Sequence, residues 1–124
     1  MSANTNSDMS SPVMYIFVNS DLKMRKGRMA AQVAHIVQSI TEEIVRDMYE
    51  RTPPPDYCLT YMTWTKKATV IILQATETQL NELRLQPEAR AFLDEIPSSN
   101  GDKELTVVGL FPTTKVQFND HKLV

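Results

Sequence analysis

The sequence has few of the residues on which disulfides, phosphate-binding loops and metal sites depend. It contains one cysteine, three glycines and two histidines in 124 residues. The single cysteine, Cys58, cannot form an internal disulfide, so nothing in the sequence requires an oxidising compartment. The glycines lie too far apart for a glycine-rich phosphate loop or a dinucleotide fingerprint. His35 and His121 have no partners at ligand spacing, so we expect neither a metal nor a cofactor.

The chain also lacks a long hydrophobic run. No segment approaches the about 20 apolar residues that span a membrane, and the polar stretch 1–12 has no apolar signal core. With 42% hydrophobic residues, a chain of this length can bury one sizeable core. We therefore expect a disordered tail at 1–12, one domain at 13–124, no membrane partner and a cytoplasmic location.

The spacing of the apolar residues predicts strands that alternate with helices. Runs at 13–20 and 68–75 are typical of buried strands, 89–94 indicates a weaker third strand, and 105–111 supplies the fourth. A helical period begins at Gly27 and continues to the breaker at 53–55, with shorter helices expected at 56–67 and 76–86. This order predicts an α/β fold, a three-layer α/β/α sandwich around a four-stranded sheet. The expected buried stripe of the long helix comprises Ala30, Val33, Ala34, Val37, Ile40, Ile44 and Met48.

The segment "DLKMRKGRMAAQ" concentrates positive charge in a chain of net charge −2. Such a chain does not coat nucleic acid, so we expect no DNA partner, but a local cationic cluster at a helix start can still bind phosphate. The alternative is an ordinary solvated turn. Arg28 and Gln32 are four positions apart and share a helix face, which we predict to point away from the core. The cationic cluster consists of Lys23, Arg25, Lys26 and Arg28.

The longer stretch "VNSDLKMRKGRMAAQVAHIV" resembles the N-terminal signature of the archaeal and eukaryotic type of peptidyl-tRNA hydrolase, D-L-K-M-G-K-G-K-x-A-A-Q-x-x-H-A. The second signature of that family, D-A-G-R-T-Q followed by T-V-L-G-I-G-P, aligns without gaps on "DEIPSSNGDKELTVVGLFP". Asp94 then stands at the motif aspartate, Ser98 at its threonine, and Thr106 at the start of the second block. The closing "DHKLV" resembles the usual G-H-L-K-L ending.

This resemblance implies a mixed sheet between helices, a homodimer, and hydrolysis of the ester that joins a peptide to tRNA, without a cofactor. It implies that Asp94 is a base or orienting carboxylate, with the simpler alternative of a loop or helix-cap carboxylate. His35 is expected to pack or to support the site through a hydrogen bond. The remaining implied roles are donors at Arg28 and Gln32, hydroxyls at Ser98 and Thr106, and RNA contacts at Lys23, Arg25 and Lys26.

Two positions depart from the family pattern. Arg28 replaces a lysine, and "EIPSS" replaces A-G-R-T-Q. Arginine can serve where the lysine is a fixed cation but not where it moves a proton. The sequence thus supports three hypotheses: an active peptidyl-tRNA hydrolase, a weakened relative that binds tRNA or another RNA, and a protein-interaction domain.

Overall fold

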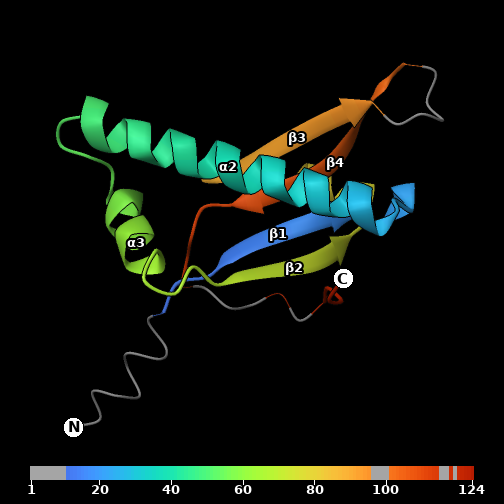
Figure 1. Cartoon of the computed structure of the whole chain (residues 1–124), viewed down its shortest axis with the longest axis horizontal. Coiled ribbons are helices and arrows are strands. Elements are labelled where there is room, and N and C mark those ends of the chain that lie inside the picture. The colour runs from blue at the N-terminus through green and yellow to red at the C-terminus, as the bar shows by residue number, and fades with distance from the viewer. Residues whose placement is uncertain (1–10, 96–100, 115–117, 119) are drawn as a thin grey trace, which may run out of the picture.

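The computed structural model describes residues 11–95, 101–114, 118 and 120–124. Four strands form one mixed sheet in the order β2-β1-β4-β3 (Figure 1). Strand β1 pairs in parallel with β2, whereas β4 runs antiparallel to both of its neighbours. The strands are β1 (Met14–Asn19), β2 (Val70–Ala75), β3 (Ala89–Glu95) and β4 (Lys103–Leu110).

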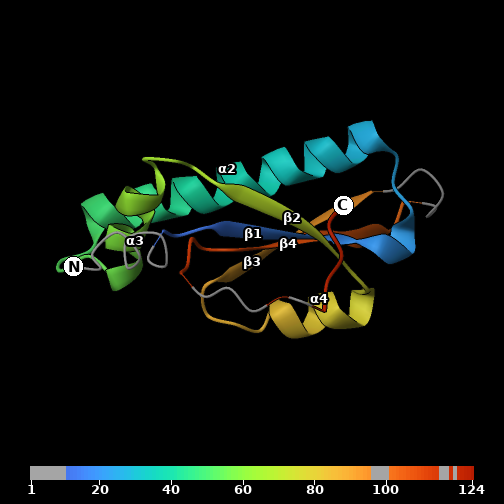
Figure 2. The same ribbon diagram turned by 90° about the horizontal axis from the view of Figure 1, so that it is seen from below.

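Helices cover both faces of this sheet. Figure 2 shows α2 (Lys26–Glu50) on one side and α4 (Glu77–Leu83) on the other. Helix α3 (Asp56–Trp64) lies on the same face as α2, because Cys58 and Trp64 join the apolar cluster that α2 forms with the sheet. The predicted α/β class with a four-stranded mixed sheet is therefore confirmed, as are the expected helices and strands, with ends that differ by a few residues.

Each face of the sheet has its own apolar core, because side chains alternate along β1. Met14, Ile16 and Val18 pack under α2, while Tyr15 and Phe17 pack under α4. All six residues of β1 are buried, as expected for a central strand covered on both sides. Within the described residues, none of the helices is long and apolar enough to cross a membrane.

The prediction for the buried face of α2 was partly wrong. Ala30 and Ala34 are exposed, whereas Gln32 and Ile36 are buried together with Ile40 and Ile44. The buried side chains follow a row of every fourth residue, so the face that carries Gln32 points at the sheet and not away from it. A polar residue is tolerated in this row because both the nitrogen and the oxygen of its amide are hydrogen-bonded there, as described below.

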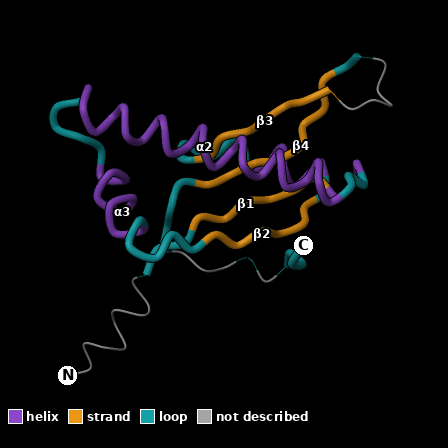
Figure 3. The backbone as a smooth tube through the Cα atoms, in the orientation of Figure 1, coloured by secondary structure: helices purple, strands orange, loops and turns teal. Residues whose placement is uncertain are grey.

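The connections explain why α2 begins at one particular end of the sheet. A short 3₁₀ helix, η1 (Ser20–Leu22), follows β1, and α2 begins only four residues after η1. Asn19 initiates η1 by accepting a hydrogen bond from the amide of Asp21, and Lys23 then adopts the left-handed conformation with φ 50°. Figure 3 shows that α2 consequently begins near the ends of β1 and β2 and runs back across the sheet towards α3.

Candidate active site

The predicted site residues meet at the end of the sheet where β1 and β3 finish. Both strands run antiparallel to β4, so their carboxyl ends lie at the same edge. The first turns of α2 lie over this edge. Asp94 comes from β3, Thr106 from β4, and Arg28 and Gln32 from α2. Four residues up to 78 positions apart in the sequence are thereby brought together.

An irregularity in the β3–β4 pairing directs Thr106 towards α2. Phe92 pairs with Val107 and Leu93 pairs with Leu105, which leaves Thr106 as an extra residue on β4. In a regular strand Thr106 and Val107 would point to opposite faces. The β-bulge changes this alternation, so that Thr106 reaches Gln32 of α2 while Val107 also packs in the core under α2.

Gln32 lies at the centre of a hydrogen-bond chain that joins three elements. Its Nε2 donates to Oδ2 of Asp94 over 2.8 Å, and its Oε1 accepts from the Thr106 hydroxyl over 2.8 Å. The same hydroxyl lies 3.1 Å from the Phe92 carbonyl oxygen, which gives it a second acceptor. The carboxylate at one end fixes the amide orientation, because the reversed amide would turn its oxygen towards Asp94. Gln32 is only 2% exposed, so this chain holds it rigidly.

Asp94 is held as a carboxylate. Its other oxygen, Oδ1, accepts the backbone N–H of Glu95 over 2.9 Å. The hydrogen bond from Gln32 lowers the pKa of Asp94 most, followed by the Glu95 amide and by the charges of Arg28 and His35, while partial burial opposes them. The carboxyl group is therefore ionised at neutral pH. A carboxylate with a lowered pKa is a weak proton acceptor and is suited to orienting a water molecule or a cation.

Arg28 and His35 of α2 also lie near Asp94. Nη1 of Arg28 is 3.5 Å from Oδ2 of Asp94 and 3.3 Å from the Glu95 carbonyl oxygen, so the guanidinium is tied to the end of β3. The side chain of Arg28 remains 35% exposed, which leaves part of it open to a ligand. His35 stacks its ring on Phe92 with centroids 4.9 Å apart, in keeping with a packing role.

The three predicted RNA-binding residues form an exposed cationic rim beside the start of α2. Lys23 and Lys26 flank Arg25, which is the N-cap residue of the helix. None of the three forms an ion pair with another described residue. Their charges are therefore available to a polyanion. Ser98, the remaining predicted site residue, lies outside the described residues.

Sequence reasoning missed Asn19, the buried side chain that links the cationic rim to the bulge. Asn19 is 1% exposed and donates from Nδ2 to the Leu105 carbonyl oxygen over 2.8 Å, directly before Thr106. Its Oδ1 accepts the amide of Asp21, and Asp21 in turn accepts the amide of Glu77 at the start of α4. The signal was an asparagine followed by Ser-Asp immediately after a buried strand, a pattern typical of an Asx turn.

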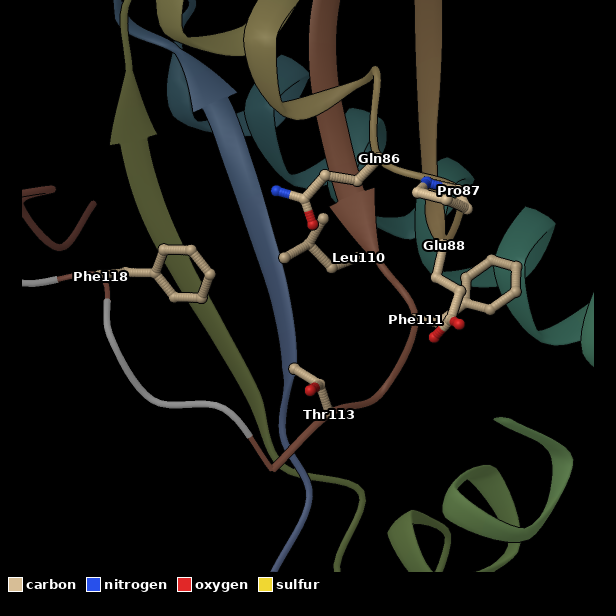
Figure 4. A pocket seen from close by; sticks show the side chains of 7 residues that line it. All are labelled: Gln86, Pro87, Glu88, Leu110, Phe111, Thr113 and Phe118. Atoms are coloured by element: carbon tan, nitrogen blue, oxygen red, sulfur yellow. The ribbon is translucent and has the colours of Figure 1, made fainter. Parts of the chain in front are cut away.

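Other parts of the described structure offer less chemistry. A pocket of about 390 Å³ lies at the opposite end of β4, where Figure 4 shows Leu110, Thr113 and Phe118 around it with Gln86 above. Among the described residues that line it, Glu88 is the only charged one. Within the described residues, no group of three or more His, Cys, Asp or Glu side chains could hold a metal ion. Cys58 is buried, and burial raises the pKa of its thiol, as for an unreactive core cysteine.

Comparison with known proteins identifies the family of the chain. The chain matches the family described as peptidyl-tRNA hydrolase PTH2 over residues 12–121, which is nearly its whole length. A comparison with curated proteins gives no match. The family match includes β1, α2, β3 and β4, the elements that form the site. The chain therefore belongs to the PTH2 family of peptidyl-tRNA hydrolases, as its two sequence signatures predicted.

Proposed function

We propose that this member of the PTH2 family hydrolyses the ester bond between a peptide and tRNA. The observation that carries the proposal is the hydrogen-bonded chain Thr106–Gln32–Asp94, with the partly exposed guanidinium of Arg28 beside it. Family membership supports the reaction class, and the exposed cationic rim suits the tRNA half of the substrate.

Ester hydrolysis adds water to the carbonyl carbon and breaks the bond from that carbon to the ribose oxygen. One proton of the water ends on the ribose oxygen, and the peptide leaves as a carboxylate with release of the other proton. Asp94 orients the attacking water through its partly exposed carboxylate, since its lowered pKa makes it a weak base. Arg28 stabilises the negative charge that develops on the carbonyl oxygen.

Gln32 takes a different role from the donor that the sequence indicated. Both ends of its amide are engaged and its side chain is buried, so it acts on the substrate through Asp94 and not by direct contact. Thr106 fixes the Gln32 amide in turn. Gln32 and Thr106 are therefore positioning residues, whereas Arg28 and Asp94 are the catalytic ones in this proposal.

The test is single-turnover cleavage of an N-acetylated aminoacyl-tRNA by the purified chain. We expect the wild type to release the blocked amino acid and Asp94→Ala to be slower by about 10²-fold or more. Glu42→Ala is the matched control, because Glu42 is an exposed carboxylate on α2, about 15 Å along the helix from Gln32. Equal rates for wild type and Asp94→Ala would refute the assignment, and no cleavage by a folded wild type would refute the function.

The oligomeric state and the cellular location of the protein stay predictions. The homodimer and the cytoplasmic location implied by the sequence are consistent with the proposal but are not needed for it.

An RNA-binding relative without turnover is the competing hypothesis. The same assay separates the two, because such a relative would bind tRNA and leave the ester intact.

A further inference from the structure

The two edges of the sheet differ in what covers them. At the outer edge of β2, the Gln74 amide donates to the Lys122 carbonyl oxygen over 2.7 Å, and the Val124 amide donates to the Ile72 carbonyl oxygen over 3.1 Å. Strand β3 forms the opposite edge and has β4 as its one strand neighbour among the described residues (Figure 1). An uncovered edge is a template for another extended chain, so the free side of β3 is a candidate binding surface.

The pairing with β4 determines which backbone groups of β3 face outward. The Phe111 amide donates to the Glu88 carbonyl oxygen over 2.9 Å, so these residues form a hydrogen-bonded pair just before β3 begins. In antiparallel strands such pairs alternate with pairs whose N–H and C=O groups point away from the partner. The extra residue of the bulge lies on β4, so the alternation along β3 is unbroken. The residues with outward backbone groups are Ala89, Ala91, Leu93 and Glu95.

Arginine side chains occupy the outward carbonyl groups at both ends of β3. Nη1 of Arg90 donates to the Ala89 carbonyl oxygen over 2.7 Å, and Nη1 of Arg28 lies 3.3 Å from the Glu95 carbonyl oxygen. The outward amides of the same two strand residues are also bonded, to a turn carbonyl and to a carboxylate respectively. The backbone is therefore satisfied within the protein at each end of the edge.

The middle of this edge is open. The N–H and C=O groups of Ala91 and Leu93 face outward, and no group among the described residues bonds to them there. Leu93 is 40% exposed and Ala91 is partly exposed, so a ligand can reach this stretch. Two donors and two acceptors are thus available to an extended chain, as in the addition of a peptide strand to a sheet.

Arg28 connects the open stretch with the active site. The guanidinium nitrogen that contacts the Glu95 carbonyl oxygen also lies 3.5 Å from Oδ2 of Asp94. Asp94 directly follows Leu93 in the strand, so the open groups begin one residue from the proposed catalytic carboxylate. An acyl group held at Arg28 therefore has the edge of β3 beside it.

We infer that the open edge of β3, residues 91–93, binds the peptide half of the substrate as an added parallel strand. The inference rests on the proposed function. The peptide ends at the ester beside Asp94, and its earlier residues lie back along β3, so both chains run in the same direction. From Glu95 to Ala91 the strand spans about 13 Å, so about four peptide residues reach the far end of the open stretch. Binding through the main chain accepts peptides of different sequence.

The first test changes only the substrate. Wild type is given N-acetylated peptidyl-tRNAs whose alanine peptides lengthen from one residue to about six, and kcat/KM is measured for each. We expect kcat/KM to rise by about 2- to 12-fold for each hydrogen bond gained, with no further gain beyond about four residues. A kcat/KM that does not depend on peptide length would overturn the inference.

Methylation of single peptide nitrogens tests the strand geometry. An N-methyl group removes one N–H donor, and in an added strand only every second residue points its N–H towards β3. We expect kcat/KM to fall by about 2- to 12-fold at alternate positions of the peptide and to change little at the positions between them. An equal loss at every position, or no loss at any, would overturn the strand geometry.

A protein variant tests the same bonds from the other side. Ala91→Pro removes an outward N–H, and proline is tolerated on an edge strand where the N–H faces solvent. The ratio of kcat/KM between a long and a one-residue peptide should fall by about 2- to 12-fold. Ala91→Ser is the matched control, because it retains the N–H and should retain the ratio. An unchanged ratio in folded Ala91→Pro would overturn the inference, and if this variant does not fold, the N-methyl series decides.

Two further outcomes separate this inference from its alternatives. If the edge instead pairs with β3 of a second copy, Ala91→Pro will lower the mass measured by light scattering and peptide length will have no effect, which overturns the inference. If wild type cleaves the ester at a rate independent of peptide length, the inference fails and the hydrolase function stands. If affinity for peptidyl-tRNA rises with peptide length but no ester is cleaved, the inference stands and the hydrolase function fails.

Discussion

Replacing Gln32 by leucine removes the central link of the active-site chain while keeping nearly the same side-chain volume. Two hydrogen bonds of 2.8 Å are lost, one to Asp94 and one from Thr106. Neither partner is left without a bond, because Thr106 retains the Phe92 carbonyl and Asp94 retains the Glu95 amide. We therefore expect the free energy of unfolding to fall by only about 1–2 kcal/mol.

The effect on catalysis should be larger than the effect on stability. Without the Gln32 amide, the Asp94 carboxylate is held only by the Glu95 amide and by Arg28 and can shift, and misplacing a catalytic group by about 1 Å can cost about 10²-fold in rate. The loss should appear in the single-turnover rate, with tRNA affinity unchanged, because Gln32 is buried and does not touch the RNA. The pKa of Asp94 should also rise, since the Gln32 hydrogen bond is the main cause of its lowering.

Three measurements test this prediction: single-turnover ester cleavage, tRNA titration, and an NMR titration of the Asp94 carboxyl group. Gln38→Leu is the control, because Gln38 is exposed on the same helix. A rate within about threefold of wild type, with a pKa of Asp94 that does not move, would show that the Thr106–Gln32–Asp94 chain does not position the carboxylate.

Further predictions concern the cations and the core. Arg28→Lys should preserve or raise the cleavage rate while Arg28→Ala lowers it, and equal rates for wild type and Arg28→Ala would show that this cation has no catalytic role. Replacing Lys23 and Lys26 by alanine should flatten the slope of log affinity against log salt by up to about two units on duplex RNA, and an unchanged slope would remove them from the interface. Gly109→Ala should lower the free energy of unfolding by about 1–3 kcal/mol, because the new Cβ would lie 2.8 Å from an isoleucine methyl of α2. Gly27→Ala, which meets nothing within 4 Å, is its control, and equal unfolding energies for the two variants would refute the close packing.

Those parts of the fold that depend on local pattern could be predicted from the sequence. The strands are marked by runs rich in apolar and β-branched residues. Pro53 marks the end of α2, and the Thr76–Gln79 capping box marks the start of α4. The bulge at Thr106 could not be predicted. Whether β4 contains an extra residue depends on its pairing with β3, and that pairing is a property of two strands and not of either sequence alone.

The burial of Gln32 illustrates the same limit for the site. Its neighbours Val33 and Ala34 are apolar, so hydrophobic periodicity alone assigns them to the core and Gln32 to the surface. The preference reverses because Thr106 supplies a hydrogen-bond donor and Asp94 supplies an acceptor for the Gln32 amide inside the protein. Those partners come from strands more than 60 positions later in the chain. In the sequence, only the family signature, which has glutamine at the position of Gln32, indicated that this residue belongs to the site.

The arrangement of Asp94 also bears on the exchange of lysine for arginine at position 28. If residue 28 were a lysine that accepted a proton, its amine would have to be neutral at working pH. A carboxylate beside the amine disfavours the neutral amine, because it stabilises the positively charged ammonium form. Asp94 is ionised here and lies 3.5 Å from Nη1 of Arg28. The surroundings therefore favour a fixed positive charge at this position, which arginine supplies as well as lysine does. The exchange is compatible with turnover because the buried partner of Asp94, Gln32, is retained and sets the carboxylate independently of the cation.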